Sequence, residues 1–378
     1  MIIVKTHIIQ KRVKRFQKIL QESRDDIDVA LFTRRENTIY FTGGITQIEC
    51  LAVIIPKEGD PAFITLWLDA PYLKKNGIKN VFGYHFPSSN LGRKIVEVLT
   101  KELGLRNPDI NIGTERYFID FPVYKELKRG FPNLKFVDLS EIIYKVRSIK
   151  ESREIECIRK ASKTLTKGMN AAVNSVEPGK SEVEVLAEAE YAMRKAGSEG
   201  SNFRMQVLAG SDRQLLTHPY ASNYKIKNNQ TVVIHLGATY RGYSSKMCRT
   251  VAVGRIPQKT KEIYDVLLEA QTAAIDALRS GTLASEVFSV AYEVVKKAGY
   301  ENYFLDVIGY GVGLRQSEFY PIIKKDSNHT IEQNMVVDLL LPTIYLKKYG
   351  GPRVTDVIHV KAKGPKILTE YSRELIGL

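Results

Sequence analysis

Hydrophobic and polar positions form two different patterns along the chain, one in each of its two parts. Before about residue 145, short apolar runs that predict buried strands alternate with amphipathic stretches that predict helices. The clearest segments are an amphipathic basic helix over 8–23, a buried strand over 29–32, and a hairpin formed by 52–55 and 62–66 around a turn signal. This alternation predicts an α/β domain with a mixed sheet over residues 1–145.

The second part, residues 146–378, has longer helical patterns. They occur at 151–174, 180–196, 259–279 and 285–298, and strand patterns occur at 203–209, 231–238, 243–253, 303–309, 334–341 and 353–361. Helices come in pairs and strands follow each pair, so a second domain of the α/β (α+β) class is predicted.

An internal repeat supports this second domain. The stretch GKSEVEVLAEAEYAMRKAG at 179–197 is echoed by GTLASEVFSVAYEVVKKAG at 281–299. Each copy is the second helix of a pair and precedes strands. The pattern predicts two duplicated ααβ halves that close over one shared cleft, where a site is expected. Chance similarity between two amphipathic helices is the alternative.

Composition places the chain among ordinary globular proteins. Hydrophobic residues make up 44% and charged residues 26%, which excludes a wholly disordered or collagen-like chain. No apolar run reaches the ~18 residues of a membrane span, and the N-terminus lacks the order of a signal peptide. Three widely spaced cysteines predict a reducing, cytoplasmic setting rather than a disulfide framework.

The net charge of +14 bears on possible partners. Residues 201–250 hold seven basic side chains and one acid, Asp212. A basic protein can bind nucleic acid, and a ribosome-associated or nucleic-acid-binding function is therefore one hypothesis. A Lys-rich solvated surface is the other interpretation.

Four ordered segments carry a more specific signal. They are VLAGSDRQLLTHP at 207–219, VIHLGATYRGYSSKMCRT at 233–250, GYGVGLRQSEFYP at 309–321 and MVVDLLLPTIYLKKYGGPRVTDVIHV at 335–360. Together they resemble the motifs of the pita-bread (creatinase/aminopeptidase, M24) family, and NTIYFTGG at 37–44 is similar to its Xaa-Pro dipeptidase (proline dipeptidase) members. The resemblance implies a creatinase-like N-terminal domain, a C-terminal pita-bread domain and a homodimer.

The same resemblance implies a metal site whose ligands are missing here. Family members hold two metal ions with two Asp, one His and two Glu. The corresponding positions in this chain are His235, Lys246, Tyr310, Leu341 and Thr355, with the register at Leu341 uncertain by one residue. Two divalent ions need several anionic ligands, so we expect neither a metal nor another cofactor.

Other residues of these segments are candidates for a pocket. His218 matches a substrate-contacting His of the family, so it is a donor or proton shuttle or, alternatively, a structural hydrogen-bonding residue. Lys246 is a base or anion-binding group, or else a charge that replaces the metal and is held by Glu318 or Asp356. The remaining pocket candidates are Cys248, Ser317 and Arg353.

The same residues bear on a single-metal site and on metal-free catalysis. His218, His235 and Cys248 contain the ingredients of a zinc site, but a full tetrahedral set is not visible. A Cys–His nucleophilic pair has the same ingredients and lacks an orienting group. The two Glu residues of metal-free creatinase would fall at Cys248 and Thr355, so creatinase chemistry is also unsupported.

The leading hypothesis is a catalytically inactive homologue of Xaa-Pro dipeptidase. It would bind a peptide, a protein segment or another ligand in the former active-site cleft. The family offers a precedent, because the peptidase-like domain of a histone-chaperone subunit is a metal-free binding module. The alternatives are an Xaa-Pro dipeptidase or other hydrolase with an unconventional site, and the basic nucleic-acid-associated protein described above.

Overall fold

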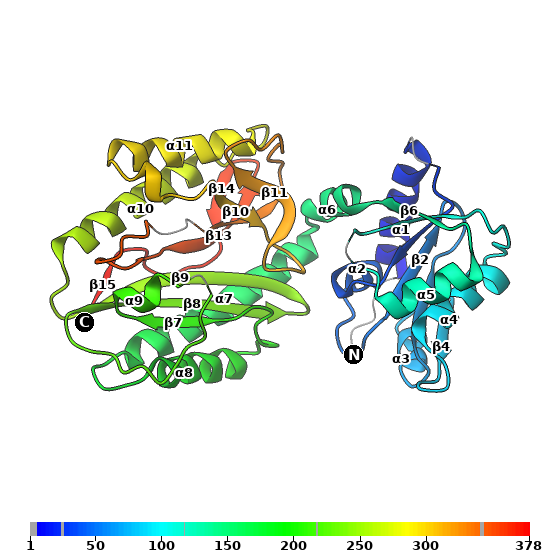
Figure 1. Ribbon diagram of the computed structural model, residues 1–378, viewed down its shortest axis with the longest axis horizontal. Helices are drawn as coiled ribbons and strands as arrows, with labels where there is room; N and C mark the ends of the chain where they lie inside the picture. Colours follow the sequence, from blue (N-terminus) through cyan, green and yellow to red (C-terminus); the bar gives the residue numbers. More distant parts are fainter. Residues whose placement is uncertain (1–5, 24–25, 117, 217, 341–343) are drawn as a thin grey trace. The chain divides into compact units, whose positions relative to one another are not determined.

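The structure is a computed structural model that describes residues 6–23, 26–116, 118–216, 218–340 and 344–378 (Figure 1). It divides into two compact units, Met1–Val146 and Arg147–Leu378. None of the helices formed by the described residues is both long and apolar enough to cross a membrane.

The N-terminal unit is built on a mixed six-stranded sheet. Its strands lie in the order β4-β3-β2-β1-β5-β6, with β2 antiparallel to both neighbours and the other pairs parallel. The elements are α1 (Thr6–Glu22), β1 (Val29–Phe32), α2 (Arg35–Phe41), β2 (Ala52–Pro56), β3 (Ala62–Leu66), α3 (Ala70–Lys75), β4 (Val81–Tyr84), α4 (Leu91–Glu97), β5 (Asn111–Thr114), α5 (Phe121–Gly130) and β6 (Lys135–Asp138). Helix α6 (Ser140–Ser148) follows. The predicted hairpin is confirmed as β2 and β3.

Burial on both faces explains why β1 is a continuous apolar run. Val29 and Leu31 belong to a core that contains residues of α4 and α5. On the other face, Phe32 packs with Phe16 of α1 and Phe41 of α2, with ring centroids 5.5–5.7 Å apart. A strand covered by helices on both sides has no polar face, so its sequence does not alternate.

The C-terminal unit is built on a nine-stranded sheet. Seven strands lie in the order β11-β10-β12-β13-β9-β8-β7, while β14 pairs with β13 and β15 pairs with β9. The elements are α7 (Ser152–Ser175), α8 (Glu182–Lys195), β7 (Gln206–Ala209), α9 (Ser211–Gln214), β8 (Gln230–Tyr240), β9 (Tyr243–Val253), α10 (Gln258–Ala277), α11 (Ala284–Lys297), β10 (Val307–Gly311), β11 (Glu318–Lys324), β12 (Val336–Leu340), β13 (Thr355–Lys361), β14 (Gly364–Ile367) and β15 (Ile376–Gly377).

The two halves of this unit repeat one another, as the sequence predicts. Gly179 (φ +95°) starts the turn into α8 and its N–H donates to the carbonyl of Ile226 at 2.9 Å. Gly281 (φ +97°) does the same before α11, donating to Ile331 at 2.8 Å. Helices α7 and α8 pack on β7–β9, while α10 and α11 pack on β11, β12 and β14, so the strands lie between the two helix pairs (Figure 1).

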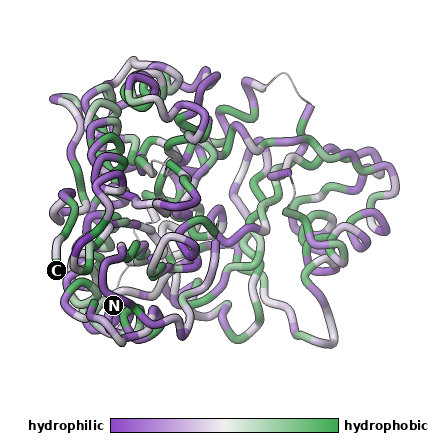
Figure 2. The backbone as a smooth tube through the Cα atoms, turned by 60° about the vertical axis from the view of Figure 1, so that its left-hand side comes forward, coloured by the Kyte–Doolittle hydropathy of each residue, from purple (hydrophilic) through white to green (hydrophobic). Residues whose placement is uncertain are grey.

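Hydropathy follows this layering. Figure 2 shows apolar stretches along the inner strands and hydrophilic stretches along the outer helices. The core beneath α7 and α8 includes Leu165, Met169, Val207 and Ile234, all fully buried. Apolar burial on this outer side of the sheet leaves the other face free to carry polar side chains.

Three details differ from the sequence prediction. The strand expected at 303–309 begins only at Val307, because residues Glu301–Tyr303 form a 3₁₀ turn. Strand β11 was not predicted, since Pro321 lies within it and proline is uncommon in strands. The short strands β14 and β15 also lack a clear apolar pattern.

Gly309 allows β10 and β12 to approach closely. A Cβ at this position would lie 2.3 Å from the backbone oxygen of Asp338. We expect Gly309→Ala to lower the free energy of unfolding by about 1–3 kcal/mol, because the backbone must shift. Urea denaturation of both variants measures this, with Gly377→Ala as the control, since no described atom lies within 4 Å of a Cβ there. Equal losses in the two variants would contradict the argument.

Candidate functional site

Strands β8, β9 and β13 bring four of the predicted site residues to one face of the C-terminal sheet. His235 in β8 lies directly opposite Cys248 in β9, and Cys248 lies directly opposite Thr355 in β13. Lys246 is two residues before Cys248 on the same strand and therefore shares its face. Segments more than 100 residues apart thus place these side chains in one cluster.

Strands β10 and β12 complete the same face. Tyr310 in β10 pairs with Asp338 in β12, and Leu340, two residues further along β12, pairs with Thr355. Leu341 lies outside the described residues. Leu340, one residue earlier, is the residue opposite Thr355, so a shift of the register to this position also gives a leucine.

Lys246 and Asp338 form a buried ion pair at the centre of this face. The Lys246 side chain is 3% exposed and that of Asp338 is fully buried. The Lys246 Nζ also donates to Ser317 Oγ at 3.0 Å, and the Tyr310 N–H donates to Asp338 Oδ1 at 2.8 Å. Burial raises the pKa of the Asp338 carboxyl, while Lys246 and the Tyr310 N–H act in the opposite direction.

Asp338 is the site residue that the sequence analysis missed. An acid in the middle of the apolar strand VVDLL is itself a signal, since a buried carboxylate requires a partner. The expectation that Glu318 or Asp356 holds Lys246 is wrong. Glu318 pairs with Arg147 and Lys150, and Asp356 pairs with Arg249, so none of these three ion pairs includes Lys246.

Glu318 is enclosed by two cations from the start of the C-terminal unit. Its Oε1 accepts from Arg147 at 2.6 Å and from the Leu314 N–H at 3.1 Å, and its Oε2 lies 3.5 Å from Lys150 Nζ. Burial alone would raise the pKa of Glu318, but Arg147 and Lys150 outweigh it and lower the pKa. Glu318 therefore forms structural ion pairs with Arg147 and Lys150 and does not neutralise Lys246.

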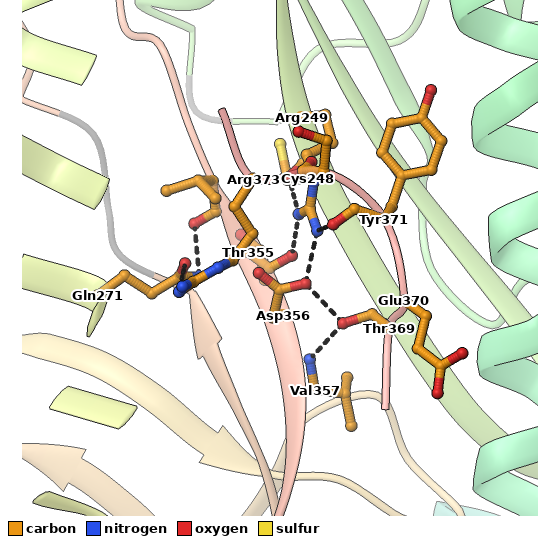
Figure 3. Close-up of polar contacts among 12 residues, drawn as sticks. Cys248, Arg249, Gln271, Thr355, Asp356, Val357, Thr369, Glu370, Tyr371 and Arg373 are labelled. Atoms are coloured by element: carbon orange, nitrogen blue, oxygen red, sulfur yellow. Dashed lines mark hydrogen bonds and ion pairs between the residues drawn. The ribbon is translucent and has the colours of Figure 1, made fainter. Parts of the chain in front are cut away.

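Asp356 points away from the cluster. It follows Thr355 on β13 and therefore faces the other side of the sheet. There its Oδ1 accepts from Arg249 Nη2 at 2.7 Å and from Thr369 Oγ1 at 2.6 Å (Figure 3). Asp356 is thus not a pocket residue, contrary to the sequence prediction.

His235 and Cys248 are both held in their neutral forms. Burial, Lys246 and Arg353 keep the pKa of His235 well below its usual range. Burial raises the pKa of the Cys248 thiol to about 12. A Cys–His nucleophilic pair needs a thiolate, so this alternative finds no support. Within the described residues, no three His, Cys, Asp or Glu side chains are grouped so as to hold a metal ion.

His218 lies at the exposed edge of the site. Its backbone carbonyl accepts a hydrogen bond from the Arg204 guanidinium, and its charge contributes to lowering the pKa of His235. His218 is therefore near the cluster, with an accessible side chain.

Arg353 braces the floor of the site. Its Nη2 donates to the carbonyl of Gln214 at 3.0 Å, its Nη1 to Gln206 Oε1 at 3.4 Å, and its backbone N–H to Thr250 Oγ1 at 2.8 Å. These contacts join α9, β7, β9 and the segment before β13, so Arg353 holds these elements together.

A pocket of about 680 Å³ adjoins this face at the β7 edge of the sheet. Its wall includes Phe203, whose ring centroid lies 5.0 Å from that of His235. Its rim includes Tyr220, which stacks on the Arg204 guanidinium at 3.8 Å. Leu186 and Met193 of α8 add apolar lining. The sequence analysis did not predict this pocket, because its wall comes from a helix and a loop without a motif.

Comparison with known proteins decides the family. Residues 156–362 match metallopeptidase family M24, and residues 12–149 match the creatinase/prolidase N-terminal domain. The chain belongs to the M24 metallopeptidase family. The predicted family and the predicted pair of domain folds are confirmed.

Several M24 relatives match almost the whole chain. The Xaa-Pro dipeptidase of Pyrococcus furiosus is 32% identical over 97% of this chain and 100% of its own. The structure of the Xaa-Pro dipeptidase from Bacillus anthracis has a TM-score of 0.87 at 29% identity, covering 98% of this chain and 100% of that one. The N-terminal domain of FACT complex subunit SPT16 from Cicer arietinum shares the fold alone, with a TM-score of 0.81 at 16% identity and 99% coverage of both chains.

The residues of this M24 chain do not fit the two-metal centre that its resemblance to the family implies. Four of the five ligand positions carry an imidazole, an ammonium, a phenol and a hydroxyl. Two divalent ions bring a charge of +4 and are held by carboxylates. Asp338 does bring a carboxylate to this face, but Lys246 already neutralises it.

The lowered pKa of His235 predicts a pH-dependent stability. Below the unfolded-state pKa of about 6.5, the unfolded chain binds a proton that folded His235 does not, so stability is full above that pH and falls below it. The slope contributed is at most about 1.4 kcal/mol per pH unit. Urea denaturation between about pH 7.5 and pH 5 should show a smaller loss for His235→Gln than for the unmodified chain. Identical losses would contradict the assignment.

Proposed function

We propose that this M24 chain binds a peptide ligand and does not carry out metal-dependent hydrolysis. The observation that carries the proposal is the Lys246–Asp338 ion pair, with Lys246 at a position that the family resemblance assigns to a metal-ligating Asp. Retention of the dipeptidase fold over nearly the whole chain supports a peptide as the ligand class.

Electrostatics opposes a divalent ion beside Lys246. Two unit charges about 4 Å apart repel by about 4 kcal/mol at an effective dielectric constant of 20, and a divalent ion doubles this to about 8 kcal/mol for an unpaired ammonium. The Asp338 carboxylate offsets part of this repulsion. The ammonium is buried, so solvent screens it little. Its charge is balanced by Asp338 without any metal.

The pocket at the β7 edge offers room for a peptide. Its volume of about 680 Å³ and its mixture of apolar, aromatic and charged lining are typical of small-ligand sites. Met193 and Met205 give the lining side chains that adapt to different apolar groups. Phe203 connects this pocket with the polar face through its contact with His235.

A hydrolase with an unconventional site is the second candidate. The contact of 3.0 Å between Lys246 Nζ and Ser317 Oγ resembles a serine–lysine pair. A base must be neutral to accept the serine proton, whereas the ion pair with Asp338 engages the ammonium form. We therefore place this candidate second.

Part of the positive charge of residues 201–250 is neutralised by ion pairs within the C-terminal unit. Of the seven basic residues in 201–250, Lys246 and Arg249 are buried in ion pairs, and Arg213 pairs with Glu182. Nucleic-acid binding stays a prediction, which affinity measured against salt concentration tests. Homodimerisation also stays a prediction, which light scattering tests.

Metal content and activity test the proposed function. After incubation with Mn²⁺, Co²⁺ or Zn²⁺ and removal of free ions, we expect no stoichiometric metal by elemental analysis. We also expect no hydrolysis of an Xaa-Pro dipeptide panel, because the carboxylate ligands are replaced. The Pyrococcus furiosus Xaa-Pro dipeptidase provides the parallel control assay.

Two results would go against the proposal. Two bound ions per chain with turnover would show that the site is built from other residues. Metal-independent turnover that Ser317→Ala abolishes would favour the serine–lysine hydrolase instead.

A further inference from the structure

Four buried side-chain atoms at this site form no hydrogen bond among the described residues. Asp338 Oδ2 is engaged in the ion pair with Lys246, and Arg353 Nε belongs to a guanidinium that donates through its other two nitrogens. The remaining two atoms, His235 Nε2 and Thr355 Oγ1, have no other partner in the described part of the chain. His235 is 8% exposed and Thr355 is fully buried. Buried polar groups are nearly always paired, so two such atoms on one face call for an explanation.

The two atoms flank one position on the sheet. His235 and Thr355 both pair with Cys248, from β8 and β13 respectively, so their backbones lie roughly 10 Å apart across it. Lys246 projects from the same face of β9 and lowers the pKa of His235 by its charge. The three side chains therefore surround a common region beside Cys248.

The region is rich in hydrogen-bond donors. An ammonium has three donors, of which Lys246 uses two, for Asp338 and Ser317. The Thr355 hydroxyl can donate one bond, and a neutral imidazole can donate from Nε2. Arg353 adds positive charge nearby, as its effect on His235 and Cys248 shows. Donors and positive charge together favour an oxyanion and disfavour a cation.

We propose that Lys246, His235 and Thr355 form an oxyanion site that binds the carboxylate of a peptide ligand. At these positions, family members bind metal cations through carboxylate side chains. In this chain the same positions would bind the ligand's carboxylate through hydrogen-bond donors. This inference rests on the proposed function, because it names the ligand group that the peptide-binding chain recognises. Tyr310 and Ser317, which lie at this face, are partly exposed.

The test compares peptides that differ only in the carboxylate. Binding of Ala-Pro, Ala-Pro amide and inorganic phosphate to the full chain is measured by calorimetry. We expect Ala-Pro to bind at least about 10-fold more tightly than the amide, since a charged hydrogen-bonded group is lost in the amide. Binding of inorganic phosphate shows whether the site accepts a free oxyanion as well as the carboxylate of a peptide.

Two threonine variants form a matched pair. Thr355→Val removes the unpartnered hydroxyl and should weaken Ala-Pro binding about 10-fold while changing amide binding less than about 2-fold. Thr355→Ser should retain the preference for the acid. Thr164→Val is the control, because its buried hydroxyl donates within α7 to the carbonyl of Ala161 at 2.8 Å. Circular dichroism confirms that each variant is folded.

The outcomes separate this inference from the proposed function. Equal binding of acid and amide, unchanged by Thr355→Val, would overturn the oxyanion site and leave peptide binding intact. Phosphate binding that Thr355→Val weakens, without peptide binding, would support the oxyanion site and contradict the peptide function. No binding of any of the three probes would overturn the inference, and metal-dependent turnover would overturn the proposed function itself.

Discussion

The buried ion pair between Lys246 and Asp338 is the interaction on which the C-terminal unit depends. Lys246 lies on β9, which belongs to the first ααβ half, and Asp338 lies on β12 of the second half, with β13 between them. Asp338 also accepts from the Tyr310 N–H of β10. Removing either charge from water costs several kcal/mol, so each is tolerated only because the other is present. The pair therefore links the two halves across the face where the family resemblance places metal ions.

The neighbouring charges follow the same rule of pairwise neutralisation. Arg249 and Asp356 are both fully buried and join β9 to β13 on the opposite face. Glu318 is balanced by Arg147 and Lys150. Asp338, Asp356 and Glu318 thus each have a cationic partner, and none of these three carboxylates remains free for a metal. The neutral His235 imidazole and Thr355 hydroxyl remain without partners among the described residues of the cluster face, and both can donate, which is the basis for the proposed ligand chemistry.

Most of the fold could be predicted from the sequence, because periodic burial determines it. Strand β9 was predicted with the bounds that the structure shows, and the repeated helices follow from the echo of 179–197 in 281–299. Strand β11 could not be predicted from its pattern, since its proline and its charged ends conceal the strand.

The motif spacing predicted which residues gather at the site, but it did not predict which charged side chains form ion pairs with one another. Whether Lys246 meets Glu318, Asp356 or Asp338 depends on strand order and on which face each side chain takes. Strand order is a long-range property that no local pattern contains. Thr355 and Asp356 are adjacent on β13, so their side chains project from opposite faces of the sheet. Had the strand pairing been known, this alternation would have excluded Asp356 as a partner of Lys246.

A double-mutant cycle on the ion pair tests the central claim most directly. Free energies of unfolding are measured for Lys246→Met, Asp338→Asn and the double variant, with asparagine chosen because its oxygen can still accept from the Tyr310 N–H. We predict that each single variant loses about 3–5 kcal/mol, because it leaves one buried charge uncompensated, and that the double variant recovers most of this loss. Small and additive losses would show that Lys246 and Asp338 do not depend on one another, and would contradict the account.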